Sequence, residues 1–235
     1  MSKENLNGIY TWLQTAQVPK MVEEALRFYG VKNSFHDPNN PIIRSWSNIL
    51  NVDVEKFYES NSHHHYNTAE LDGFVSSHSK ADLHHLFGPN LRVINEGHLV
   101  PWCGLFMGIV AHNSGIKSVN EPLYPINWEN FGTEATVPMF GDVLIFISQI
   151  ETRKKAGHVG LYIGEDRDCY HVLGGNENDT VCITRILKSR LYIARRPKYK
   201  TVPDCVRIIS LPSNYNVTRN MGILSLIGQK YKMVN

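Results

Sequence analysis

Residues 143–194 read VLIFISQIETRKKAGHVGLYIGEDRDCYHVLGGNENDTVCITRILKSRLYIA, and this stretch decides the fold class. Its apolar runs are short, rich in β-branched and aromatic residues, and separated by Gly, Asn and Asp, a pattern typical of strands. The runs are VLIF at 143–146, VGLYI at 159–163, YHVL at 170–173, VCITRI at 181–186 and LYIA at 191–194. We therefore predict a small β-sheet in the second half of the chain.

Helical signals occupy the first half. Proline at the first turn, apolar residues three and four positions apart, and a closing glycine are the signals that we use. They predict helices at 19–30, 41–50, 79–88 and 103–112. Because helices come first and strands second, without strict alternation, we expect an α+β fold with an antiparallel sheet.

Composition excludes several classes of protein. With 42% hydrophobic residues, the 235-residue chain can bury a sizeable core. Its 24 Lys and Arg against 22 Asp and Glu give a net charge of +2, too little to indicate a nucleic-acid-binding protein. We expect one domain over residues 1–197, with a His-rich insertion at about 52–98 and a C-terminal extension over 198–235.

The first residues, MSKENLNG, contain no apolar segment of the kind that a signal peptide needs, and we find no apolar run long enough to span a membrane. We therefore expect synthesis in the cytoplasm without membrane insertion. Action in the periplasm or on a target cell wall would then require a non-classical route of delivery.

Three residues together indicate a thiol hydrolase. Cys103 falls at the predicted start of a helix, where the dipole and free backbone N–H groups favour a thiolate and can bind an oxyanion. His158 opens a strand, and Asn176 follows at the end of the next one, so two paired strands can bring them together. Asn176 could then orient the ring while His158 acts as base toward Cys103. Each residue taken alone is more often structural, and only their joint order favours catalysis.

Five motifs in order carry a resemblance to a known family. They are PWCGLF at 101–106, GDVLIF at 141–146, GHVGLYIG at 157–164, VLGGNENDTV at 172–181 and ARRP at 194–197. In these motifs the chain resembles the small papain-like amidases of the CHAP and NlpC type. The resemblance implies a papain-like fold, with N-terminal helices packed on the sheet, and cleavage of amide bonds in peptidoglycan. It assigns the nucleophile to Cys103, the general base to His158, the orienting role to Asn176, and a substrate-wall or packing role to Trp102.

Two positions depart from the family pattern, and both are candidate substrate-binding residues with Trp102. Gly104 replaces the usual Ser or Ala, which weakens the helix start slightly and is expected to free space above the thiol. Glu177 replaces a neutral amide. If it faces the site, its charge could raise the pKa of His158 or repel an anionic substrate.

The histidines of the insertion invite a metal interpretation, which we do not favour. The seven residues are His63, His64, His65, His78, His84, His85 and His98. They match no C-x₂-C or H-E-x-x-H pattern, so a solvated loop is the better hypothesis than a zinc site, and we expect neither a metal nor a cofactor.

Cys169 and Cys182 flank the Asn176 turn, and a hairpin could place them opposite one another. We favour free thiols, with a disulfide as the alternative in an oxidising compartment. Cys205 has no evident partner.

The leading hypothesis is a peptidoglycan amidase or endopeptidase that uses a Cys–His–Asn mechanism, delivered as a phage lysis enzyme or as a secreted antibacterial effector. An effector would require a cognate immunity protein and a secretion-system component. The alternatives are a thiol protease or deamidase that acts on proteins, and a catalytically silent papain-like module that binds wall or partner. The sequence leaves open which amide bond is cleaved.

Overall fold

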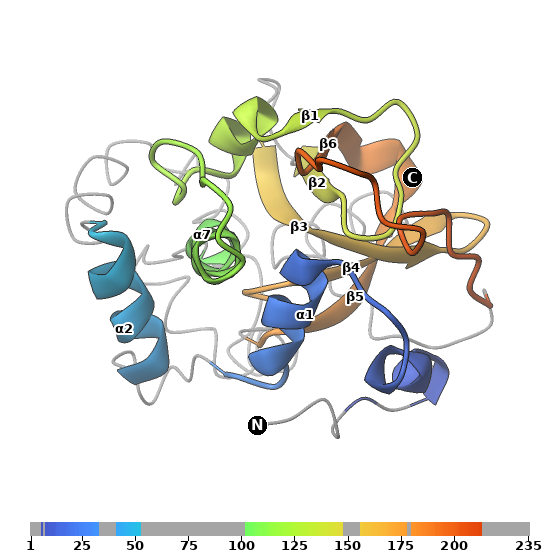
Figure 1. The fold of residues 1–235 in the computed structure, drawn as a ribbon, viewed down its shortest axis with the longest axis horizontal. Coiled ribbons are helices and arrows are strands. Elements are labelled where there is room, and N and C mark those ends of the chain that lie inside the picture. Colours follow the sequence, from blue (N-terminus) through green and yellow to red (C-terminus); the bar gives the residue numbers. More distant parts are fainter. Residues whose placement is uncertain are drawn as a thin grey trace, which may run out of the picture.

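The computed structural model of the chain describes residues 6, 8–32, 41–52, 102–147, 156–177 and 180–212. Its centre is an antiparallel sheet of six strands in the order β1-β6-β2-β3-β4-β5 (Figure 1). The strands are β1 Thr133–Glu134, β2 Val143–Ile147, β3 Ala156–Glu165, β4 Cys169–Gly174, β5 Cys182–Leu187 and β6 Leu191–Arg196. The five predicted strands are confirmed. Strand β1 was not predicted, because two exposed residues carry no alternation that a sequence pattern could register.

Three α-helices are described, and each lies where the sequence predicts one. They are α1 Lys20–Arg27, α2 Pro41–Leu50 and α7 Cys103–Asn113. The chain also forms three short 3₁₀ helices in its described part: η2 Gly8–Gln14 before α1, η4 Pro125–Asn130 after α7, and η5 Lys188–Arg190 between β5 and β6. The predicted helix at 79–88 and the His-rich insertion fall outside the described residues. Helices and an antiparallel sheet together confirm an α+β fold.

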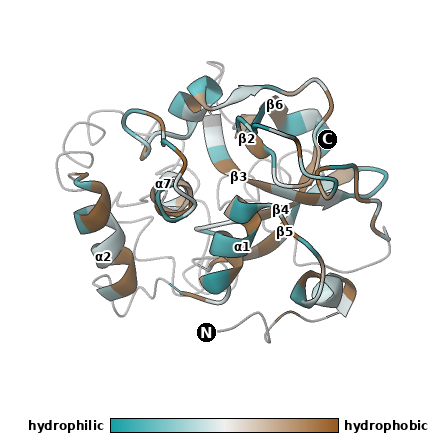
Figure 2. Ribbon diagram, in the orientation of Figure 1, coloured by the Kyte–Doolittle hydropathy of each residue, from teal (hydrophilic) through white to brown (hydrophobic). Residues whose placement is uncertain are grey.

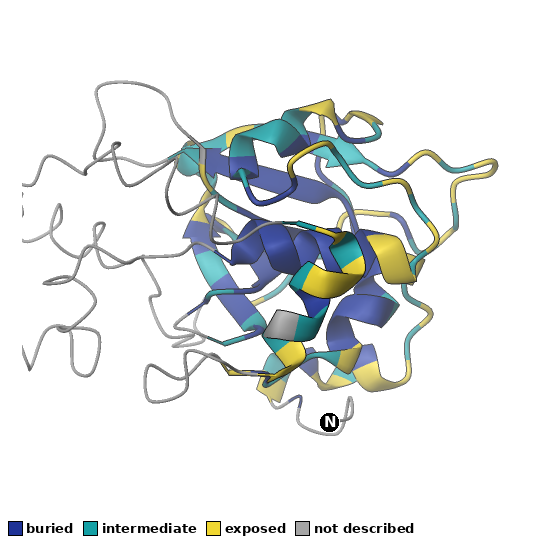
Figure 3. Cartoon of the chain, turned by 90° about the vertical axis from the view of Figure 1, so that its left-hand side faces the viewer, coloured by how far each residue is buried: buried dark blue, intermediate teal, exposed yellow. Residues whose placement is uncertain are grey.

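Helix α7 is the core element that carries Cys103. All nine residues from Cys103 to Ala111 are buried, so the helix is apolar on every side. It contacts α1, α2, β3 and β4, and Figure 2 shows it end-on between α2 and α1. In Figure 3 the same helix and the sheet behind it are buried, whereas the outer helices carry exposed residues. The nucleophile predicted from the sequence therefore stands on a rigidly packed element.

Strand register separates the two cysteines that flank the Asn176 turn. Cys169 lies opposite Leu187, and Cys182 lies opposite Gly174, five residues further along β4. At about 3.4 Å per residue this offset is roughly 17 Å, far beyond the reach of a disulfide. All four cysteines lie in the described part of the chain, and none of them forms a disulfide there. The hairpin that could have paired Cys169 with Cys182 has the wrong register, and free thiols are the outcome.

Among the helices described, none combines the length and the apolar composition needed to cross a bilayer.

Candidate active site

The N-terminus of α7 presents Cys103 with unsatisfied backbone donors. Trp102 is the N-cap residue and provides no side-chain cap. The first backbone hydrogen bond of the helix runs from the Phe106 N–H to the Trp102 carbonyl, 2.9 Å apart. The N–H groups of the first turn before Phe106 thus have no acceptor within the helix. Together with the helix dipole they favour negative charge at this point.

His158 is held by the sheet. It sits near the start of β3 directly opposite Phe146 of β2, and the two rings are stacked with centroids 6.5 Å apart. Its side chain is 15% exposed, whereas Cys103 is 1% exposed. The site is therefore largely enclosed, and its small open part belongs to the imidazole.

Glu177 contacts a nitrogen of the His158 ring. Oε1 of Glu177 lies 2.6 Å from Nε2 of His158, an ion-pair contact whose angles fall outside those of a hydrogen bond. The same ring also interacts with the Cys103 thiol. Glu177, a candidate substrate-binding residue in the sequence analysis, thus contacts His158, and the orienting role of Asn176 stays a prediction.

Strand register explains the one-residue difference. Leu161 of β3 pairs with Leu173 of β4, so three more residues of ideal pairing would set His158 opposite Asn176, as the sequence predicts. Strand β4 ends at Gly174, however, and Asn176 adopts a φ of 61°, in the left-handed region. This turn redirects the chain and delivers the next side chain, that of Glu177, to the ring.

The Glu177 backbone is fixed by its own turn. Its N–H donates to the Thr180 carbonyl and its carbonyl accepts from the Thr180 N–H, at 3.0 and 3.2 Å. The Cys182 thiol also donates to the Glu177 carbonyl, at 3.4 Å. A Cβ on Gly174 would lie 3.0 Å from His158 Nε2 and 3.1 Å from Glu177 Oε1, so any larger residue there would crowd the contact between the two side chains.

Electrostatics favour a charged imidazole. Burial by itself lowers the pKa of His158, but the Glu177 carboxylate, together with the Cys103 thiol, raises it to about 10. A raised pKa of His158 is one of the two effects that the sequence analysis expects if Glu177 faces the site. A ring with this pKa is an imidazolium at neutral pH and can hold a neighbouring thiolate as an ion pair.

Cys182 is the other thiol near Glu177, and its chemistry differs. Burial, and to a smaller extent the Glu177 charge, raise the pKa of Cys182 to about 12. It therefore stays a neutral thiol at neutral pH and is a poor nucleophile. Of the two thiols, only Cys103 interacts with the histidine.

Gly104 and Trp102 are both packing positions. A Cβ on Gly104 would lie 2.2 Å from the Pro122 carbonyl oxygen, so the glycine lets residues 122–123 pack against the helix. It does not free space above the thiol, and that explanation for Gly104 was wrong. Trp102 is 2% exposed and packs on Trp46, with ring centroids 6.1 Å apart, so of its two expected roles the packing role has structural support.

Sequence reasoning missed Arg190, which lies close enough to Glu177 to interact with its charge. Burial lowers the pKa of Arg190, and the Glu177 carboxylate partly offsets this effect. Its guanidinium donates a long hydrogen bond of 3.4 Å to the Ile147 carbonyl at the end of β2. Only strand order could have identified it, because β6, which follows Arg190, pairs with β2 and not with its sequence neighbour β5.

In the part of the chain that the structure describes, no three His, Cys, Asp or Glu side chains gather as a metal site would require. The histidines of the insertion lie outside that part. No protein-family model matches this chain, and no curated protein matches it.

The arrangement supports covalent chemistry at sulfur. It combines an enclosed thiol at an uncapped helix N-terminus, a basic ring that interacts with the thiol, and a carboxylate in contact with Nε2 of that ring. These are the elements of nucleophile, acid–base group and orienting group used in amide hydrolysis.

Proposed function

We propose that this chain is a papain-like, cysteine-dependent amidase or peptidase that cleaves an amide bond of peptidoglycan. The single observation that carries the proposal is the assembly of His158 between the Cys103 helix start and the Glu177 carboxylate. The resemblance of five ordered motifs to CHAP and NlpC amidases supplies the substrate class.

Acylation begins from the ion pair of Cys103 thiolate and His158 imidazolium. The thiolate sulfur attacks the carbonyl carbon, and the developing oxyanion is bound by free N–H groups of the first turn of α7. As the C–N bond breaks, His158 transfers its proton to the leaving nitrogen. The products of this half-reaction are a free amine, a neutral His158 and a thioester on Cys103.

Deacylation reverses the proton flow. Neutral His158 takes a proton from water while the water oxygen attacks the thioester carbonyl carbon. The C–S bond then breaks, which releases a carboxylic acid and restores the thiolate–imidazolium pair. In sum, one water and one amide bond give one acid and one amine.

Glu177 is the orienting group of this mechanism. Its contact with Nε2 holds the ring that interacts with the Cys103 thiol, and its negative charge stabilises the imidazolium more strongly than a neutral amide would. Asn176 contributes by its left-handed conformation, which turns the chain and places Glu177. The triad that we propose is therefore Cys103, His158 and Glu177.

The test is digestion of purified sacculi by wild type, Cys103→Ala and Cys205→Ala. Cys205 is a free, partly buried cysteine outside the site, so it controls for the general loss of a thiol. We expect soluble fragments from wild type and Cys205→Ala and none from Cys103→Ala, and mass spectrometry of the fragments identifies the scissile bond.

Equal digestion by Cys103→Ala would contradict the thiol mechanism. Sacculus binding without release of fragments by any version would favour the silent binding module, and cleavage of a protein substrate alone would favour the protease alternative.

A further inference from the structure

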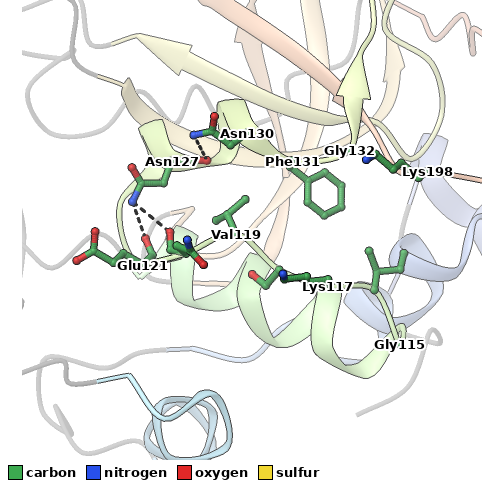
Figure 4. A pocket seen from close by; sticks show the side chains of 12 residues that line it. Gly115, Lys117, Val119, Glu121, Asn127, Asn130, Phe131, Gly132 and Lys198 are labelled. Atoms are coloured by element: carbon green, nitrogen blue, oxygen red, sulfur yellow. Dashed lines mark hydrogen bonds between the residues drawn. The ribbon is translucent and has the colours of Figure 1, made fainter.

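A polar pocket of about 710 Å³ lies at the end of α7 opposite Cys103. It is formed by the loop that follows α7, by η4 and the residues just after it, and by Lys198 (Figure 4). An eleven-residue helix is about 16 Å long, so the pocket and the thiol are separate sites. The volume is in the range of pockets that hold small ligands.

One side of the pocket presents hydrogen-bond acceptors. The Asn127 carboxamide nitrogen donates to the carbonyls of Asn120 and Glu121, and that of Asn130 donates to the Asn127 carbonyl. Asn127 thus uses both of its side-chain N–H groups within the wall and Asn130 one of its two, while the two carboxamide oxygens remain as acceptors. The Glu121 carboxylate lies on the same side in Figure 4. A ligand here must bring N–H or O–H donors.

The other side presents cations. Lys198 lies across the pocket from Asn127 and Glu121 in Figure 4, and Lys117 lines the same cavity. Within the described residues, neither lysine has a carboxylate at ion-pair distance. Ammonium groups only donate, so a ligand must bring acceptors to this side, and a carboxylate is the best match.

A third feature indicates that the pocket accepts a polar ligand. The Ser118 hydroxyl lines it, is buried, and has no hydrogen-bond partner among the described residues. A buried hydroxyl without a partner costs free energy, which a ligand group can recover. Between the two polar sides Figure 4 shows the Phe131 ring, which supplies an apolar surface.

The walls are held in place before any ligand binds. The Trp128 indole N–H donates to the Pro122 carbonyl at 3.0 Å, and Arg195 donates to the Phe131 carbonyl at 2.6 Å. The Asn127 side chain of η4 holds the loop after α7 through its hydrogen bonds to the Asn120 and Glu121 carbonyls. A preformed pocket loses less conformational entropy on binding.

We propose that this pocket binds a short peptide that carries both a free amine and a free carboxylate, the amine toward Glu121 and the carboxylate toward Lys117 and Lys198. Stem peptides of peptidoglycan that contain a diamino acid carry both groups. Their assignment as the ligand rests on the proposed function, whereas the zwitterionic class rests on the pocket alone. The pocket would then hold a second part of the substrate, away from the thiol.

The experiment uses the full chain with Cys103→Ala, so that the ligand is not consumed, and the tripeptide L-Ala–γ-D-Glu–diaminopimelate as probe. Amide chemical shifts and calorimetry follow binding. We expect shifts at residues 115–121 and 127–132. The double variant Lys117→Glu/Lys198→Glu should weaken binding about tenfold or more, because two attractive charges become repulsive. Lys200→Glu, an exposed lysine outside the pocket, should change affinity by less than about twofold.

Ligand variants test the chemistry. Acetylation of the probe's amines should weaken binding, and Glu121→Gln should abolish the difference between acetylated and free peptide. If the double charge reversal perturbs folding, Lys117→Gln/Lys198→Gln replaces it. The proposal is overturned if about 10 mM peptide causes no chemical-shift changes in the pocket. It is also overturned if neither double lysine variant changes the affinity. Complete competition by inorganic phosphate at equal concentration overturns the peptide class.

The two proposals fail separately. If the chain binds the tripeptide in the pocket but leaves sacculi intact, the pocket proposal stands and the hydrolase proposal fails. If the chain digests sacculi but the peptide causes no chemical-shift changes in the pocket, the hydrolase proposal stands and the pocket proposal fails.

Discussion

At the scale of single residues, the charge on Glu177 determines the protonation of the candidate site. The resting state suited to attack is a thiolate beside an imidazolium, and that pair persists only below the pKa of His158. Because the largest opposing effect, burial, favours the neutral ring, a nearby carboxylate is what keeps His158 charged. A neutral amide in the same place would orient the ring but would add much less charge stabilisation.

Replacing Glu177 by Gln should therefore lower the pKa of His158 from about 10, since the contribution of the carboxylate raises it. The alkaline limb of the pH–activity profile should move down by on the order of 1 to 3 pH units. Titration of the imidazole by NMR measures the pKa without reference to activity. Glu134→Gln, an exposed position on β1, is the matched control and should leave the pKa unchanged. An unchanged His158 pKa in Glu177→Gln would show that Glu177 does not set the charge of the ring.

At the scale of elements, a second buried network fastens η2 to the sheet. The His171 ring, fully buried on β4, contacts the Tyr10 hydroxyl through Nδ1 at 2.6 Å and Asp166 through Nε2 at 2.8 Å. Arg185 of β5 donates to the same Asp166 carboxylate. Burial is the main cause that lowers the pKa of His171, so the ring is neutral, with Nε2–H donating to Asp166 and the Tyr10 hydroxyl donating to Nδ1.

His171→Phe should lower the free energy of unfolding by about 2–4 kcal/mol, because it removes two buried hydrogen bonds and leaves their partners unsatisfied. Urea unfolding measures the change, and the exposed Arg167→Ala should stay within about 0.5 kcal/mol of wild type.

The stability of the wild type and that of His171→Phe should also depend differently on pH. With the folded pKa of His171 lowered, its stabilisation is complete above the ordinary value of 6.5 and is lost as pH falls through the folded pKa. Wild type should therefore lose stability more steeply than His171→Phe below pH 6.5. Parallel stability curves for the two proteins would contradict a neutral buried His171.

At the scale of the whole molecule, the segment after β6 belongs to the sheet domain. The Phe140 N–H donates to the Arg207 carbonyl, and Glu165 exchanges backbone hydrogen bonds with Ile209 and Leu211 at 2.8 Å. Val206 is buried. These contacts fasten residues 206–211 to β3 and to the turn before β2.

A chain that ends at Lys200 should accordingly lose about 2–5 kcal/mol of folding free energy, because three backbone hydrogen bonds and the apolar contact of the buried Val206 disappear. Thermal unfolding checks this. The control is Ile208→Ala, whose side chain is 48% exposed and should matter little. A truncated chain with the unfolding temperature of the full chain would show that the segment does not contribute to the domain.

The prediction of elements succeeded where local patterns are strong. The runs at 143–146, 159–163 and 170–173 became strands, because short runs of β-branched and aromatic residues bounded by Gly, Asn and Asp mark strands even where both faces are buried. The helix at Cys103 was likewise predicted, and it is buried on every side. Local patterns do not contain strand order. The position of β6 beside β2, which brings Arg190 to the Glu177 side of the sheet, followed only from the assembled sheet.

The sequence by itself determined the α+β class and singled out Cys103 and His158, because a helix start and a strand start are local events. Only the tertiary structure showed that Glu177 contacts the histidine, because the chain turns at the left-handed Asn176 just before it. It also decided the distance between Cys169 and Cys182, the reason for Gly104, and the pocket at the far end of α7. Each of these depends on register or on contacts between distant segments, which no local pattern encodes.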